Sequence, residues 1–296
     1  MYYNALSDHL RRRFGRKVYK LSLQGVATCP NRAGTVGDRG CIFCSPYGSG
    51  EFATCGRSIA QQIVDAKRRV AAKVPPDAAY IAYFQSFTNT YAPVSYLEPL
   101  FRAAISHPDV VVLSIATRPD CLPGNVLNLL AELNRIKPVW VELGLQTIHA
   151  DTARYIRRGY ELPVYDKAVA DLHARGIEVI THVILGLPGE DRERMLETVR
   201  YVGGHTDGIK LQLLHVLRGT DLAADYAAGK FRALELEEYC DLVVDCLRVL
   251  PERVVIHRLT GDGAKKDLIA PLWSGDKKRV LNTLNQRIKG ACLEQA

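Results

Sequence analysis

Short apolar runs alternate with longer helical patterns along most of the chain. Six runs have the length and the aliphatic character of β-strands, and they cover residues 19–26, 79–84, 109–117, 139–147, 177–188 and 208–217. Between and after them, apolar residues recur at helical spacing, in residues 58–73, 95–105, 123–135, 163–176, 191–202 and 235–250. Strands that are largely apolar on both faces and are separated by helices predict a parallel sheet covered by helices.

Local signals place the ends of three of these helices. Ser58 precedes the first helical pattern as an N-cap, and Ser95 with Glu98 has the spacing of a capping box. Pro163 begins another helix, which ends near Gly176. These signals agree with the order of strands and helices that the apolar pattern predicts.

Six successive β–α units predict an α/β protein with a partial, open (β/α)6 TIM-like barrel in place of a closed eightfold one. The chain has no internal repeat, low-complexity tract or obvious interdomain linker. We therefore expect a basic N-terminal segment at residues 1–18 and the barrel at residues 19–260. A C-terminal extension at residues 261–296 would pack on the barrel.

Polar and glycine-rich stretches follow the predicted strands. QSFTNTY follows the second strand, TRPD the third, GLPGED the fifth and HVLRGT the sixth, while GLQT ends the fourth. Parallel barrels carry their chemistry on the face formed by the carboxyl ends of the strands. The loop after the first strand opens on the same face, so we expect the active site there.

Composition indicates the class of protein and its compartment. Hydrophobic residues make up 47% and charged residues 24% of the chain, which is typical of a soluble globular protein. No apolar run reaches the length of a membrane span, and no apolar h-region follows the basic N-terminus. We therefore expect a cytoplasmic protein with no membrane partner. Its eight cysteines then argue against a disulfide framework and favour metal binding or catalysis.

Three cysteines lie in the loop after the first strand, in the stretch CPNRAGTVGDRGCIFC. Eleven residues separate Cys29 from Cys41, and two separate Cys41 from Cys44. Three thiolates could hold an iron–sulfur cluster with one iron open to a substrate or cofactor. With Cys55 as a fourth ligand they could instead form a structural zinc site. The polar, glycine-containing spacer disfavours a third interpretation, in which they are unrelated core cysteines.

The run Cys41-Ile42-Phe43-Cys44, together with Cys29, resembles the cluster motif of the radical S-adenosylmethionine (SAM) superfamily in a long-spacer form. The resemblance implies that the three cysteines hold a [4Fe–4S] cluster, and that SAM binds the fourth iron through its amine and carboxylate. Phe43 would lie near the adenine of SAM. Most members have three residues in the first gap, and a gap near eleven marks a particular subgroup.

Further stretches resemble one branch of this superfamily. Residues 117–120 and 142–147, with His182, are similar to the radical-SAM module of the Elongator catalytic subunit, which modifies carbon 5 of the wobble uridine in tRNA. Over residues 18–275 the chain looks like a bacterial radical-SAM family associated with the same base. The resemblance implies an enzyme that converts the carboxymethylaminomethyl group at carbon 5 of 2-thiouridine towards aminomethyl.

The resemblance also implies roles for residues near the strand ends. Glu142 and Gln146 would face the ribose hydroxyls of SAM, and the alternative for Glu142 is a buried charge paired with Arg118. Arg118 is itself expected among the cofactor-binding residues. The backbone near Leu185, in the stretch LGLPGED, would approach the adenine, and the alternative there is an ordinary strand-to-helix turn.

The contacts to the methionine part of SAM depart from the usual pattern. The superfamily usually has Gly-Gly-Glu after the second strand, whereas this chain has QSFTNT. Gln85, Thr88 and Asn89 offer suitable donors and acceptors, and the alternative is a turn held by side-chain-to-backbone bonds. His182 is a candidate catalytic residue, as proton donor or substrate contact, and His215 is a candidate cofactor contact. Packing is the alternative for both histidines.

The charge balance bears on the partner. Lysine and arginine number 39 against 32 aspartate and glutamate, and the excess gathers in residues 10–17, 67–69, 265–266 and 277–279. The net charge of +7 is compatible with a polyanionic partner, and the resemblance implies tRNA and a flavodoxin- or ferredoxin-type electron donor. One alternative is a radical SAM enzyme acting on a small metabolite or a protein side chain. The other is a non-enzymatic zinc-binding protein that uses Cys55.

Overall fold

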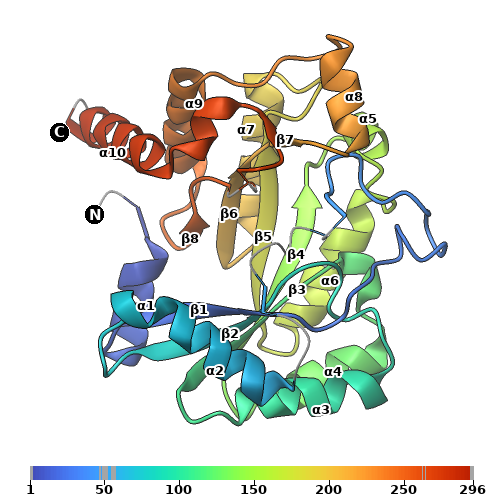
Figure 1. Ribbon diagram of the computed structural model, residues 1–296, viewed down its shortest axis with the longest axis vertical. Coiled ribbons are helices and arrows are strands. Elements are labelled where there is room, and N and C mark those ends of the chain that lie inside the picture. The colour runs from blue at the N-terminus through green and yellow to red at the C-terminus, as the bar shows by residue number, and fades with distance from the viewer. Residues whose placement is uncertain are drawn as a thin grey trace.

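Seven parallel strands form one curled sheet at the centre of the molecule (Figure 1). In this computed structural model the described residues are 3–46, 48, 53–54, 58–261, 263 and 265–293. The strands follow one another in the order β1, β2, β3, β4, β5, β6 and β8. Within the described residues, the outer strands β1 and β8 pair with no further strand of this sheet, so the barrel is open. The predicted α/β class and the partial TIM-like barrel are confirmed.

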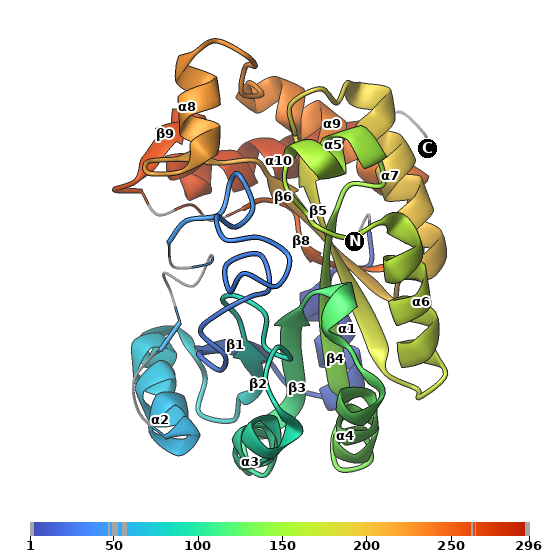
Figure 2. The same cartoon turned by 90° about the vertical axis from the view of Figure 1, so that its right-hand side faces the viewer.

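The strands that form the curled sheet are β1 (Val18–Leu23), β2 (Ala79–Phe84), β3 (Val110–Thr117), β4 (Val139–Gln146), β5 (Glu178–Leu185), β6 (Gly208–Leu213) and β8 (Val255–Arg258). Two further short strands pair in antiparallel fashion outside it, β7 (Val216–Leu217) and β9 (Leu268–Ala270). Figure 2 shows the loop between β1 and α2 on the open side of the curled sheet, with helices packed around the outside.

The α-helices are α1 (Leu6–Phe14), α2 (Ile59–Val70), α3 (Val94–Ile105), α4 (Gly124–Asn134), α5 (Ala150–Tyr155), α6 (Leu162–His173), α7 (Arg192–His205), α8 (Asp221–Ala227), α9 (Leu236–Val249) and α10 (Lys277–Leu293). Three short 3-10 helices are η1 (Ala71–Lys73), η2 (Pro119–Cys121) and η3 (Leu272–Gly275). In the part of the chain that the structure describes, no helix has both the length and the apolar character to cross a membrane.

Two strand predictions are wrong. The sixth strand, predicted over residues 208–217, leaves the sheet after Leu213, and residues 216–217 pair with β9 instead. The apolar run continues through this break, so the hydrophobic pattern carries no sign of the change of partner. The seventh strand, β8, pairs with β6 and was not predicted, because its four residues are too few for a clear pattern.

Helix ends follow the capping rules in part. The Ser58 side chain accepts a hydrogen bond from the Gln61 amide at 3.4 Å, which confirms this N-cap. The capping box at Ser95 is wrong, because α3 begins at Val94 after Pro93 and has no side-chain cap. Glu98 lies inside the helix and accepts a hydrogen bond from Arg102 Nε at 2.7 Å. Pro93 already sets an extended backbone before the helix, so its start shifts by one residue.

The two faces of the sheet differ in polarity. Side chains on the outer face pack against the helices in the main apolar core, as Leu113, Leu143 and Leu211 do. Alternate residues on the same strands point to the inner face, and there Glu142 and Lys210 are buried as well. Nearer the amino ends of the strands the inner face is apolar, where Ile81, Val112 and Trp140 pack with Leu10 of α1. The polar part around Glu142 and Lys210 forms the floor of the site described below.

The ends of the chain flank the sheet. Helix α1 packs on β1 and β8, and α10 packs on α9 and η3. The predicted boundaries at residues 18 and 260 stay a prediction.

Candidate active site

A cavity of about 420 Å³ opens on the inner side of the curled sheet. Its wall combines the loop after β1 with the carboxyl-end halves of β2 to β6 and with β8. Most of the predicted site residues line it, namely Cys29, Cys41, Phe43, Cys44, Gln85, Thr88, Arg118, Glu142, Gln146, His182 and His215. The tertiary structure thus gathers residues from across the chain around one space.

Two predicted cofactor contacts do not line this cavity. Asn89 is fully buried, and its amide donates to the carbonyls of Ser86 and Ala116 at 3.0 Å each, while its Oδ1 accepts from the Val26 amide at 3.2 Å. Leu185 is fully buried in the main core. We therefore assign Asn89 to the scaffold, because its side chain is already used there. The predicted approach of the backbone near Leu185 to the adenine stays a prediction.

The loop that carries the three cysteines is held by hydrogen bonds at both ends. The Cys29 carbonyl accepts from the Arg32 amide at 2.9 Å, and the Cys41 carbonyl accepts from the Cys44 amide at 3.0 Å. The Arg32 guanidinium donates to the Cys44 carbonyl at 3.1 Å. Asn31 Nδ2 donates to Cys41 Sγ at 3.4 Å. These bonds fold a loop of irregular structure so that all three thiols face the cavity.

The chemistry of the three thiols fits a metal cluster. All three are free, and burial raises the pKa of Cys41 and raises that of Cys44 to about 12. Buried thiols of this kind become thiolates when a metal replaces their protons. Among the described residues, no three His, Cys, Asp or Glu side chains converge on one ion-sized position. Three cysteine ligands can hold a [4Fe–4S] cluster with one iron left open, and Cys55, the fourth ligand of the zinc alternative, lies outside the described residues.

Two orphaned polar atoms face the same cavity. Gln146 Oε1 and Ser86 Oγ are buried and have no hydrogen-bond partner among the described residues. Their backbones are strained, since φ is 73° at Gln146, 72° at Ser86 and 54° at Phe87. Positive φ is uncommon in residues other than glycine, and it gathers at ligand sites. The orphaned atoms and the strain fit a ligand with hydroxyl or amine groups, as SAM has.

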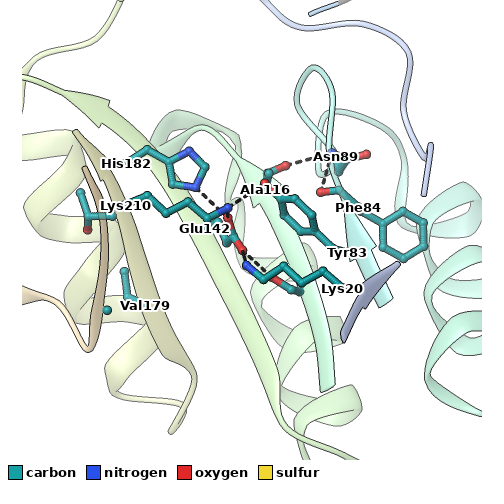
Figure 3. A network of polar contacts seen from close by, with 12 residues as sticks. Lys20, Tyr83, Phe84, Asn89, Ala116, Glu142, Val179, His182 and Lys210 are labelled. Atoms are coloured by element: carbon teal, nitrogen blue, oxygen red, sulfur yellow. Dashed lines mark hydrogen bonds and ion pairs between the residues drawn. The ribbon is translucent and has the colours of Figure 1, made fainter. Parts of the chain in front are cut away.

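Glu142 lies at the centre of a buried ionic network on the inner face of the sheet (Figure 3). Its Oε1 accepts from Lys20 Nζ at 3.3 Å and from Ser114 Oγ at 2.8 Å. Its Oε2 accepts from His182 Nε2 at 2.7 Å and from Lys210 Nζ. The carboxylate is 0% exposed, so both oxygens are already satisfied within the protein.

The network fixes the protonation states of its members. Burial alone would raise the pKa of Glu142, but Lys20, Lys210 and the bond from His182 bring it well below its ordinary value. Burial and Lys210 lower the pKa of His182 to about 4, so at neutral pH the neutral ring donates its Nε2 hydrogen to Glu142. Burial raises the pKa of Tyr83, which stays a phenol.

These contacts correct one interpretation of Glu142, and its predicted contact with the ribose of SAM stays a prediction. The pairing with Arg118 is wrong, because Arg118 pairs with Asp120 at 2.7 Å. A contact from Glu142 to the ribose of SAM would require it to give up one of its present partners. His182 lines the cavity, and its Nε2 is used to hold Glu142.

The sequence prediction missed Lys20 and Lys210. Each is a single charged residue within an otherwise apolar strand, in KLSL and GIKLQLL. A lysine at such a position is rarely buried without a partner, and this was the available signal for an internal ion pair. The partner itself could not be found that way, because it lies 122 residues from Lys20 and 68 from Lys210.

We expect Glu142→Gln to lower the free energy of unfolding by about 3–5 kcal/mol, because Lys20 and Lys210 would then face a neutral amide in place of a carboxylate. Urea unfolding followed by circular dichroism measures this loss. The matched control is Glu132→Gln, which removes an exposed carboxylate 3.3 Å from Arg102 and should cost about 0–1 kcal/mol. Equal losses in the two variants would contradict the central role of Glu142.

Comparison with known proteins gives the family. The sequence model of the Radical SAM superfamily matches residues 32–202, and that of the Radical_SAM C-terminal domain matches residues 206–290. The protein YtqA of Bacillus subtilis (strain 168) is 46% identical over 289 residues, which are 97% of this chain and 89% of that protein.

More distant likenesses point to one branch. The tRNA uridine(34) acetyltransferase of Methanocaldococcus jannaschii is 27% identical over 51% of this chain and 28% of its own length. Among solved structures, the archaeal Methanocaldococcus infernus Elp3 with an N-terminal deletion has a TM-score of 0.66 at 18% identity, over 85% of this chain and 58% of that one. That structure supports the fold. The chain therefore belongs to the radical SAM superfamily, whose enzymes use a [4Fe–4S] cluster and SAM.

Proposed function

We propose that this radical SAM protein modifies the carbon-5 side chain of the wobble (2-thio)uridine in tRNA, converting carboxymethylaminomethyl towards aminomethyl. The observation that carries the radical SAM chemistry is a single cavity faced by three free thiols and by the orphaned polar atoms of Ser86 and Gln146. The tRNA substrate is supported by the resemblance to the Elongator module and by the similarity to the tRNA uridine(34) acetyltransferase of Methanocaldococcus jannaschii.

Each part of the cavity wall would hold one part of the cofactors. Cys29, Cys41 and Cys44 would hold the cluster, and Phe43 would pack beside the adenine. When bound, the cluster and SAM supply a 5′-deoxyadenosyl radical that abstracts a hydrogen atom from the substrate. Gln146 would bind the ribose hydroxyls, since its amide both donates and accepts.

The turn after β2 would bind the methionine part of SAM. Gln85, Ser86 and Thr88 all line the cavity there. The left-handed backbone at Ser86 and Phe87 turns this segment sharply, and Asn89 holds the turn by three bonds to backbone carbonyls. We therefore assign Asn89 the role of positioning this turn in place of direct contact.

The chain also shields the cavity and orients its wall. Apolar side chains of Ile156, Ile184 and Leu214 line it and help to exclude solvent and side reactions from the site. Arg158 is 3% exposed and donates to the Thr147 carbonyl at 2.5 Å, which holds the end of β4. The protein thus binds, orients and protects, while the radical chemistry belongs to the cofactors.

Replacing Cys41 by alanine should abolish the cofactor chemistry. The measurement is anaerobic reconstitution with iron and sulfide, followed by SAM and dithionite, with 5′-deoxyadenosine as the product. The unchanged protein should hold about four irons per chain and form this product, and Cys41→Ala should lose both. Cys121→Ala is the matched control, because Cys121 is a buried thiol outside the cavity wall. Tightly held zinc in place of iron would contradict the proposal.

Replacing Gln146 by leucine should weaken SAM binding about tenfold, because a buried polar contact to the ribose is lost. Equilibrium dialysis of SAM with the cluster-loaded protein measures the dissociation constant. Gln61→Leu on α2 serves as the control, since Gln61 bonds to Asp65 outside the cavity. An unchanged affinity in Gln146→Leu would remove Gln146 from the SAM site.

Cells that lack the protein should accumulate carboxymethylaminomethyl-uridine at the wobble position and lose its aminomethyl product. Mass spectrometry of digested tRNA measures both nucleosides, and restoring the gene should reverse the change. An unaltered set of wobble-uridine modifications, with 5′-deoxyadenosine still formed by the pure protein, would instead favour a small metabolite or a protein side chain as substrate.

A further inference from the structure

The cavity wall carries more positive than negative side chains. Among the described lining residues, the cationic ones are Arg32, Arg118, Arg158, Lys210 and Arg258, and the single carboxylate is Glu142. On the side formed by β5, β6 and β8, three lining residues occupy neighbouring positions across the three strands. His182 is in register with Lys210, and Lys210 is in register with Arg258.

Some of this charge has a counter-charge nearby. Arg118 pairs with Asp120. Arg32 donates to backbone carbonyls beside Cys44, so a cluster held by thiolates would place negative charge next to it. Lys210 differs, because its contacts are to Glu142 and Tyr83, and it shares Glu142 with Lys20.

Lys210 has unused binding capacity. Its side chain is 3% exposed and lines the cavity. In its charged form, which an incoming anion would favour, the Lys210 amine carries three hydrogens, and the described residues accept two of them, at Glu142 Oε2 and at the Tyr83 hydroxyl 3.0 Å away. The third has no acceptor among the described residues.

The network around Lys210 holds an excess of positive charge. Two lysines, Lys20 and Lys210, share the one carboxylate of Glu142. Burial lowers the pKa of Lys210 well below its ordinary value, and Lys20 and Arg258 add to that effect while Glu142 opposes it, so the charged form of Lys210 lacks sufficient negative charge around it. His182 and Tyr83 do not offset the excess, because both are neutral at physiological pH. A buried cation without its own counter-ion costs free energy, and an anion that enters the cavity would relieve that cost.

We propose that Lys210, supported by Glu142 and Lys20, forms an anion subsite that binds a carboxylate on the substrate side chain. The subsite rests on the function proposed above, and it explains how the cavity distinguishes a carboxymethylaminomethyl group from its aminomethyl product. The proposed reaction would break the bond between the amine nitrogen and the carboxymethyl carbon, and the two-carbon fragment would leave as glyoxylate. Its oxygen would come from water, one hydrogen atom would go to the SAM-derived deoxyadenosyl group, one electron would return to the cluster and one proton would be released. The product lacks the carboxylate, so it binds this wall less tightly and leaves.

The test compares two anticodon stem-loop RNAs that differ in one group. One carries carboxymethylaminomethyl-uridine at the wobble position, and the other carries the corresponding uncharged carboxamide. Each is titrated anaerobically into the cluster-loaded protein with SAM and without reductant, so that no reaction occurs. We expect the carboxylate RNA to bind about 10–100-fold more tightly, as a charge-assisted hydrogen bond would give.

Three variants locate the source of that ratio. Lys210→Met should bring the ratio of the two dissociation constants, carboxamide RNA over carboxylate RNA, close to one. Lys210→Arg should retain most of the difference. Lys210→Met should also stay folded, because one ammonium, Lys20, is left to balance Glu142. Lys167→Met on α6 is the control for loss of a positive charge, since Lys167 is 76% exposed and pairs with Asp171, and it should leave the ratio unchanged.

Other outcomes overturn the subsite. An unchanged ratio in Lys210→Met would do so directly. Equal weakening of both RNAs in that variant would assign Lys210 to a backbone phosphate, and weaker SAM binding would assign it to the methionine carboxylate of SAM.

Adding dithionite separates this inference from the proposed function. If the wild-type protein discriminates between the RNAs but leaves both chemically unchanged, the proposed reaction fails and the subsite stands. If it converts the carboxylate RNA while Lys210→Met keeps the full ratio, the reaction stands and the subsite fails.

Discussion

The buried carboxylate of Glu142 is the contact on which the inner face of the sheet depends. Its partners come from four other strands, Lys20 on β1, Ser114 on β3, His182 on β5 and Lys210 on β6. A fully buried charged side chain is tolerated only when it is paired and hydrogen-bonded. The pairing therefore couples the curvature of the sheet to the position of each inner side chain, and the cavity takes its shape from that coupling.

The cysteine loop depends on the sheet in a second way. Regular secondary structure does not hold this loop, so side chains and single backbone bonds must do so. Asn31 joins Cys41 Sγ to the Arg157 carbonyl, with donor distances of 3.4 and 2.6 Å, and the Ile42 amide donates to the Ile156 carbonyl at 3.2 Å. Hydrogen bonds to cluster sulfurs are among the factors that set reduction potential, so the same bonds that place the loop also bear on its redox chemistry.

The cavity divides its chemistry between two sides. Thiols, orphaned polar atoms and strained turns lie on the side of the cysteine loop, β2 and β4, where cofactors would bind. Lys210 and Arg258 lie on β6 and β8, where the substrate would enter, whereas Arg32 lies in the cysteine loop and Arg118 follows β3. A radical enzyme needs this separation, because the cofactor must be held rigidly while the substrate must leave after each turnover.

The sequence by itself determined the order of the first six strands of the sheet and of the six longer helical patterns that follow them, the open barrel, and the three cysteines with their spacing, because those signals are local. It also placed Gln146 and His182 at the correct strand ends. The sequence could not identify Lys20 as a partner of Glu142, because Lys20 lies 122 residues away. A long-range ion pair produces no repeating pattern of residues that could reveal it. Tertiary structure alone decided that Asn89 holds a turn, that the chain changes sheets after Leu213, and that Lys210 faces the cavity. Each of these depends on which strands become neighbours, and that is a property of the folded chain.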